Sequence, residues 1–92
     1  MAEVRDVREK SRFELEEGGG VSFADYRRGA DGTIAILHVE TPAALRGQGI
    51  AGRLMDGIVA LARAEGARLA PICPYAVAYL RRRADTRDVW AG

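Results

Sequence analysis

A glycine-rich junction between two apolar segments constrains this sequence more than any other feature. Residues 33–39 are rich in β-branched and apolar side chains and predict a strand. From Ile50 onward, apolar residues recur at helical spacing. Between them lies the run RGQGIA, residues 46–51, whose glycines let the backbone turn sharply. We call residues 46–51 the elbow. Because the first N–H groups of a helix have no intrahelical partner and lie at the positive end of its dipole, the elbow is a candidate anion site.

Two common phosphate-binding motifs do not fit the elbow. No Lys-Ser/Thr pair follows its last glycine, and Gly-x-Gly is shorter than the dinucleotide fingerprint. The run resembles instead the Arg/Gln-x-x-Gly-x-Gly/Ala signature of the GNAT acetyltransferases, in which this loop binds the pyrophosphate of acetyl-coenzyme A (acetyl-CoA). His38-Val39-Glu40 before the elbow and Cys73-Pro74 after it are similar to a small single-domain GNAT-like family (YjdJ type). The resemblance extends from about Arg12 to Trp90.

The resemblance implies a fold, a cofactor and an activity. It predicts an α/β (α+β) minimal GNAT fold over residues 1–92, with a mixed, mostly antiparallel sheet of four to five strands and two flanking helices. A chain of 92 residues, 48% of them hydrophobic, can bury one core and form one domain. The implied cofactor is acetyl-CoA. The residues that we expect to contact it are Val39, Arg46, Gly47, Gln48, Gly49, Ile50, Ala51, Cys73, Tyr75 and Tyr79. The alternative for the elbow is a glycine turn that only packs the helix closely on the sheet.

The first half of the chain predicts two hairpins. Residues 1–11 are either a mobile start or a short edge strand. Residues 12–17 alternate charged and apolar side chains, and residues 21–28 form their partner strand. The triple glycine 18–20 between them predicts a plain hairpin turn, with a flexible loop over a ligand as the alternative. A second turn at Asp31-Gly32 leads into the central strand.

The second half predicts a strand-helix-strand unit and a final helix. Residues 33–39 are apolar at both odd and even positions, so we expect both faces of this strand to be covered. The helix after the elbow ends at Gly66, and Gly57 in its middle suggests close packing. Residues 68–72 form a short strand parallel to the central one. The second helix spans residues 75–84. Its inner face is predicted to hold Val77, Leu80 and Ala84, and residues 86–92 form a tail that packs Val89 and Trp90 against the body.

Charge and cysteine content limit the partners that the protein can have. With 14 basic and 13 acidic residues, the net charge of +1 predicts neither nucleic-acid nor membrane binding. One cysteine and one histidine cannot form an internal disulfide or, by themselves, a metal site. No apolar run approaches about 20 residues, and the first residues are too polar for a signal peptide. We therefore expect a cytoplasmic protein, favour a monomer, and predict no metal.

His38 and Glu40 are the first candidates for acid-base chemistry. Two residues apart on a strand, they share a face at the end nearest the elbow. Either can accept the proton of an amine, directly or through water. The alternative is a hydrogen-bonded interior histidine and a solvated glutamate. A β-bulge between the two residues would break the shared face.

Cys73 is the third candidate, because Pro74 suits the first position of a helix and so places the thiol at the cap. A thiol that faces free helical N–H groups has a lowered pKa and becomes a better nucleophile. Direct attack by the amine and an acetyl-cysteine intermediate are both compatible with this position. A buried small hydrophobic residue is the structural alternative.

Tyr75 and Tyr79 lie one helical turn apart, and larger GNAT enzymes often use a tyrosine hydroxyl near the thioester sulfur. Either could protonate the departing thiolate, or both could be tyrosines at the edge of the core. Arg81-Arg82-Arg83 is best interpreted as a solvated helix end, with the 3′-phosphate of the coenzyme as a local alternative partner.

The sequence therefore predicts an N-acetyltransferase that moves an acetyl group from acetyl-CoA to an unidentified amine, a small molecule or a protein lysine, in a ternary complex. The first alternative is a non-enzymatic acyl-CoA-binding module. The second is a small interaction domain with a vestigial elbow. Larger GNAT proteins have a helical segment between their first two strands where this chain has only glycines, which implies an open cleft suited to a protein lysine.

Overall fold

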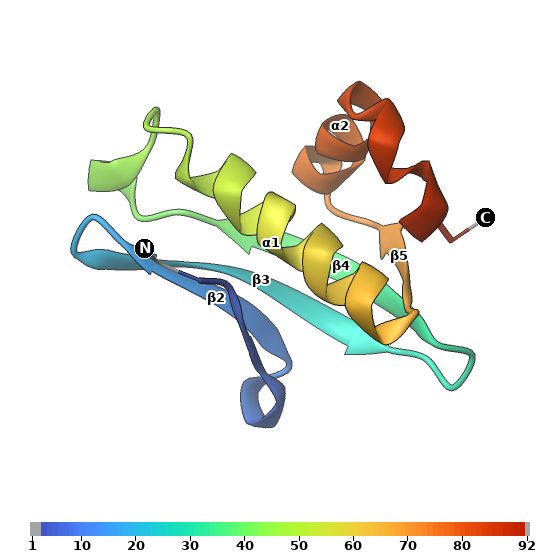
Figure 1. Cartoon of the computed structure of the whole chain (residues 1–92). Helices are drawn as coiled ribbons and strands as arrows, with labels where there is room; N and C mark the ends of the chain where they lie inside the picture. Colours follow the sequence, from blue (N-terminus) through green and yellow to red (C-terminus); the bar gives the residue numbers. More distant parts are fainter. Residues whose placement is uncertain (1–2, 92) are drawn as a thin grey trace.

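A single mixed sheet of five strands forms the body of the protein (Figure 1). The computed structural model describes residues 3–91. Residues 1–2 and 92, which belong to the segments predicted at the two ends, lie outside the described residues. The strands follow one another across the sheet in chain order: β1 (Arg5–Val7), β2 (Arg12–Glu17), β3 (Gly20–Arg28), β4 (Thr33–Glu40) and β5 (Arg68–Pro71). The first four are antiparallel and β5 is parallel to β4, as expected. The segment before Arg12 contains the short edge strand.

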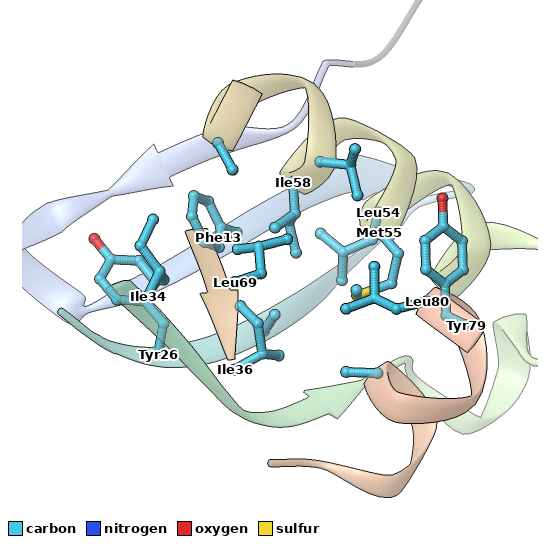
Figure 2. Close-up of a cluster of buried hydrophobic side chains, with 14 of the residues drawn as sticks. Phe13, Tyr26, Ile34, Ile36, Leu54, Met55, Ile58, Leu69, Tyr79 and Leu80 are labelled. Atoms are coloured by element: carbon cyan, nitrogen blue, oxygen red, sulfur yellow. The ribbon is translucent and has the colours of Figure 1, made fainter. Parts of the chain in front are cut away.

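Two α-helices pack on the same face of this sheet (Figure 1). They are α1 (Ile50–Glu65) and α2 (Pro74–Arg82), and β5 lies between them in the chain. Three short 3-10 helices complete the structure: η1 (Arg8–Lys10) between β1 and β2, η2 (Ala43–Leu45) between β4 and α1, and η3 (Ala84–Val89) after α2. Figure 2 shows the core between the helices and the sheet, where Leu54 and Ile58 of α1 meet Phe13 and Ile36 of the strands. None of the helices formed by residues 3–91 is long and apolar enough to cross a membrane. The predicted fold class is confirmed.

The prediction that both faces of the central strand are covered is wrong. In β4 only Ile34 and Ile36 are buried, Leu37 is partly exposed, and His38 and Glu40 are exposed. Both helices pack on one face of the sheet, where α2 contacts α1 and β5. The opposite face, which we call the open face, is covered by cross-strand polar and aromatic pairs instead of a helical layer.

A β-bulge in β4 decides which side chains reach the open face. His38 is paired with Asp25 and Ile36 with Tyr26, so Leu37 is an extra residue in β4. One extra residue reverses the direction of the side chains that follow it. Val39, opposite the buried Ala24, therefore points toward the core, and His38 and Glu40 point away from it.

The predicted inner face of the second helix needs correction. The helix ends at Arg82, Val77 is only partly buried, and Ala84 lies beyond the helix and is exposed. The buried residues of α2 are Ala76, Tyr79 and Leu80. Tyr79 takes an interior position because its hydroxyl donates a hydrogen bond to Asp56 of α1, which satisfies the buried polar group. The expected packing of the tail is confirmed: Val89 is buried, and Trp90 forms a parallel bridge with Leu69 of β5.

Close backbone packing explains two of the glycine positions. A Cβ on Gly57 would overlap Cγ2 of Val4, so the segment before β1 crosses α1 at this residue. A Cβ on Gly20 would lie 2.8 Å from a methyl carbon of Leu45 in η2. The triple glycine forms the plain hairpin turn, because Glu17 pairs with Gly20 across it. The tip of this hairpin supports the segment that leads to the elbow.

Candidate functional site

The elbow connects η2 to α1 through two residues with left-handed backbone conformation. Gly47 has φ 83° and Gly49 φ 77°, and the first α-helical residue is Ile50. Arg46, between η2 and Gly47, is extended. A side chain at either glycine position would strain this backbone, which accounts for the Gly-x-Gly spacing in the sequence.

Within the described residues, the main-chain N–H groups from Gly47 onward in the elbow have no acceptor, whereas Arg46 N donates to Ala43 O at 3.4 Å. Within residues 3–91, no acceptor lies within hydrogen-bonding distance of any main-chain nitrogen from Gly47 to Gly52. The first internal hydrogen bond of α1 runs from Arg53 N to Gly49 O, at 3.1 Å. No side chain caps the helix. Six successive N–H groups, from 47 to 52, are therefore available to an anion at the positive end of a helix of 16 residues.

Two arginines with different roles lie at the elbow. Arg46 donates from Nε to Thr41 O at 3.1 Å, and its exposed guanidinium forms no ion pair within the described residues. Arg53 instead connects the elbow to the first hairpin: Nη2 donates to Gln48 O at 3.1 Å and Nε to Glu17 Oε2 at 2.9 Å. Its hydrogen bond to Glu17 raises the pKa of Arg53 and lowers that of Glu17. Arg46 is thus free for a ligand, and Arg53 braces the loop.

A pocket of about 220 Å³ opens at the elbow. Its walls come from the end of β4, the elbow, the first turn of α1 and Tyr75 of α2. The lining residues are Thr41, Leu45, Arg46, Gly47, Gly49, Ile50, Ala51, Gly52 and Tyr75. The Tyr75 hydroxyl lies 4.0 Å from where a Cβ on Gly52 would be and has no hydrogen-bond partner among residues 3–91. Burial raises the pKa of Tyr75, so its phenol stays protonated at neutral pH.

The sheet opens between β4 and β5 beside this pocket. Their pairing ends at Ile36 and Pro71, and the nitrogens of Ile72 and Cys73 both donate to Ile36 O, each at 3.0 Å. Beyond that point the chain of β5 turns into α2. The β5-side main chain of β4 from Leu37 to Glu40 therefore has no strand partner within the described residues. We call this gap the opening.

Cys73 caps α2 at the base of the opening, with Pro74 at the first helical position as expected. Its side chain is only 8% exposed and belongs to the hydrophobic core, and it makes no capping hydrogen bond. The position predicted for Cys73 is confirmed, whereas its catalytic role stays a prediction.

His38 and Glu40 form a pair on the open face. His38 Nε2 lies 3.0 Å from Glu40 Oε1, and the side chains are 55% and 50% exposed. The ring of Phe23, opposite Glu40 on β3, lies with its centroid 6.3 Å from that of His38. The bulge at Leu37 precedes both residues, so their shared face is kept. His38 is not the interior residue of the structural alternative, and a catalytic role for the pair stays a prediction.

Tyr79 is separate from the elbow pocket. Its hydroxyl donates to Asp56, and the guanidinium of Arg83 lies 5.0 Å from its ring centroid and 3.3 Å from Asp56 Oδ1. Burial, followed by the hydrogen bond to Asp56, raises the pKa of Tyr79 strongly. The structure thus brings Tyr75, and not Tyr79, to the elbow.

Four residues of the site were not among the candidates from the sequence. Thr41, Leu45 and Gly52 line the pocket but lie outside the six-residue signature, and Arg53 follows it in the helix. Pairing of Arg53 with Glu17 joins positions 36 apart in the chain, which no local pattern indicates. In residues 3–91 no three His, Cys, Asp or Glu side chains are placed to hold a metal ion.

Comparison with known proteins agrees with this geometry. The family model described as GCN5-related N-acetyl-transferase matches residues 12–89. The chain belongs to the GCN5-related N-acetyltransferase family. Its fold is similar to the NMR structure of a GCN5-like protein from Staphylococcus aureus, with a TM-score of 0.74 and 24% sequence identity, over 98% of this chain and 88% of that one. No curated protein matches the sequence. In this GCN5-related domain the elbow is the junction between β4 and α1, and it carries the signature from which the family was inferred.

Proposed function

We propose that the protein transfers an acetyl group from acetyl-CoA to an amine, and that the elbow binds the diphosphate of the cofactor. The observation that carries the proposal is the row of main-chain N–H groups from Gly47 to Gly52 without internal acceptors. Buried or convergent N–H groups are normally paired in folded proteins, so a free row at a helix N-terminus fits an anionic ligand. The N–H groups of Gln48, Gly49, Ile50 and Ala51 are our choice for the diphosphate, with Arg46 adding positive charge.

The opening between β4 and β5 is suited to the extended part of the cofactor. The main chain of β4 from Leu37 to Glu40 offers unpaired groups along one edge, and the elbow pocket lies beside the start of α2. An extended amide-containing chain can pair with such an edge as an additional strand does. We therefore propose that Val39, Cys73 and Tyr75 lie along the cofactor.

The acceptor amine approaches from the open face. When bound, acetyl-CoA supplies an activated thioester whose carbonyl carbon is attacked by the amine nitrogen. The His38–Glu40 pair projects from this part of β4 to the open face and can act as an acid-base group. If His38 Nε2 carries a proton and donates it to Glu40, Nδ1 presents a lone pair that accepts the proton released by the amine.

The thiolate that leaves when the carbon–sulfur bond breaks needs a proton. The Tyr75 hydroxyl lines the elbow pocket, has no partner within the described residues and has a raised pKa, so it is protonated and free to donate. Tyr79 already donates to Asp56. We propose direct attack by the amine over an acetyl-cysteine route, because the Cys73 side chain is packed in the core.

Two measurements test the proposal. Acetyl-CoA is expected to raise the melting temperature, because a ligand that binds only the folded state stabilises it. Transfer to lysine peptides and small amines is expected, with kcat reduced about 10²- to 10⁴-fold in His38→Gln or Glu40→Gln and the cofactor Kd unchanged. Absence of a thermal shift at millimolar acetyl-CoA would refute the proposal. Binding without turnover would identify an acyl-CoA-binding module instead.

A further inference from the structure

A shallow apolar groove begins at the opening and runs along the outer side of α2. It has a volume of about 590 Å³ and is lined by Ile72, Pro74, Val77, Ala78, Arg81 and Arg82. The Ile72 side chain is 62% exposed, the largest exposed fraction among the large hydrophobic side chains of residues 3–91. Because Ile72 lies directly before Cys73 and its nitrogen bonds to Ile36 O, the groove starts where β4 and β5 separate.

The groove continues toward the C-terminal segment. A second hollow of about 270 Å³ shares Val77 and Arg81 with the first and adds Pro71, Leu80, Trp90 and Ala91. From Pro74 to Arg82 the helix rises about 12 Å, at about 1.5 Å per residue. The apolar floor therefore extends well beyond the reach of a single side chain.

The two ends of this groove differ in charge. Arg81 and Arg82 are exposed and form no ion pair among the described residues, whereas the next arginine is paired with Asp56. The opposite end begins at Ile72, whose nitrogen bonds to Ile36 O of β4, and the same strand carries the half-exposed carboxylate of Glu40 four residues farther on. A ligand that covers the groove would therefore place a cation at the opening and carboxylates at the far end of α2.

We propose that the groove binds an acidic peptide segment of a protein acceptor, with its lysine at the opening. This inference rests on the proposed function. An extended peptide advances about 3.3 Å per residue, so carboxylates about four residues from the lysine reach the two arginines. Arg81 and Arg82 favour a peptide over a membrane, because stable attraction to anionic lipid requires clusters of about four to eight basic residues.

The test uses the peptide Ac-Lys-Gly-Leu-Val-Glu-Glu-NH₂ and a second peptide with both glutamates replaced by lysine. Binding is followed by the emission of Trp90, which lines the groove, and acetylation of the peptide by mass spectrometry. The double variant Arg81→Gln/Arg82→Gln is compared with Arg27→Gln/Arg87→Gln, which changes the net charge equally at exposed arginines outside the groove. Each protein is also sedimented with phosphatidylglycerol vesicles.

The acidic peptide is expected to bind more tightly than the basic one. Arg81→Gln/Arg82→Gln is expected to raise its Kd about tenfold, the effect of losing two exposed ion pairs, while the control variant keeps the wild-type value. Equal binding of both peptides, an unchanged Kd in the groove variant, or vesicle binding that depends on Arg81 and Arg82 would overturn the inference. If acetyl-CoA stabilises the protein and the peptides do not bind as expected, only the groove assignment is refuted. If the acidic peptide binds as expected and acetyl-CoA does not, the proposed function fails and the groove assignment stands.

Discussion

Substitution of Gly47 by alanine tests the elbow most directly, because the same helix provides a matched control. Gly47 has φ 83° and Gly66, which caps the C-terminus of α1, has φ 71°. A Cβ at either position would meet nothing within 4 Å. Alanine at each site therefore introduces the same kind of backbone strain without a steric clash.

The expected loss of stability is similar for the two variants. Left-handed conformation costs an alanine about 1–2 kcal/mol, which for a domain of this size lowers the melting temperature by roughly 4–16 °C. In the wild type, acetyl-CoA at about 100 times its Kd adds about 2.7 kcal/mol. Gly47→Ala turns the N–H groups of the elbow out of alignment, and we expect at least tenfold weaker binding, which lowers this gain to about 1.4 kcal/mol.

Differential scanning fluorimetry with and without acetyl-CoA separates the two effects. Gly47→Ala is expected to lose about half of the ligand-induced shift or more, and Gly66→Ala to keep all of it. Isothermal titration gives the Kd independently of stability. If both variants retained the full shift, the main-chain donors of the elbow would not be the anion site, and the argument from the unpaired N–H groups would be refuted.

Three further predictions concern other parts of the chain. Gly57→Ala is expected to lower the free energy of unfolding in urea by about 1–3 kcal/mol, because the added Cβ overlaps Val4. This loss is expected although alanine favours helices more than glycine does. Adding Val4→Ala to the same chain should restore the stability. The hydrogen bond to Arg28 lowers the pKa of Glu65 in the folded protein. The ionised Glu65 therefore stabilises the fold above the ordinary pKa of 4.5, and this contribution is lost as the pH falls through the lower folded pKa. The difference in Tm between wild type and Glu65→Gln should close in that acidic range, and a constant difference would contradict this. Cys73→Ala should retain turnover, and intact mass spectrometry of wild type with acetyl-CoA should show no acetylated protein; an acetylated Cys73 would establish the covalent route.

Local patterns in the sequence were sufficient for the order of the elements and for the elbow. The alternation of residues 12–17 and the helical spacing after Ile50 each depend on neighbours within a few positions, which is why β2 and α1 agree with expectation. The two glycines of the elbow likewise report a backbone conformation that is local. Cys73 before Pro74 marked the start of α2 for the same reason.

Those local patterns did not indicate how the helices and strands pack against one another. Residues 33–39 are apolar at both odd and even positions, but which face is covered depends on where α2 packs, and α2 lies against α1 rather than on the open face. The interior position of Tyr79 depends on a hydrogen-bond partner, Asp56, 23 positions away. The ion pair between Arg53 and Glu17 was not indicated by the sequence for the same reason, since the helix and the hairpin come into contact only in the folded protein.

The bulge at Leu37 links the two halves of the proposed site. If the same residues formed a regular strand without a bulge, the period of two would continue from Ile36, so His38 would point into the core and Val39 to the open face. Imidazole and carboxylate would then be buried under α1 and α2, on the side of the elbow pocket, and the acceptor side of β4 would carry no acid-base group. With the bulge, the His38–Glu40 pair lies on the open face, while the main-chain edge of β4 beyond Ile36 has no strand partner among residues 3–91. Under the proposed function, the bulge thus lets the cofactor and the acceptor approach the same short segment of β4 from different directions, which direct transfer in a ternary complex requires.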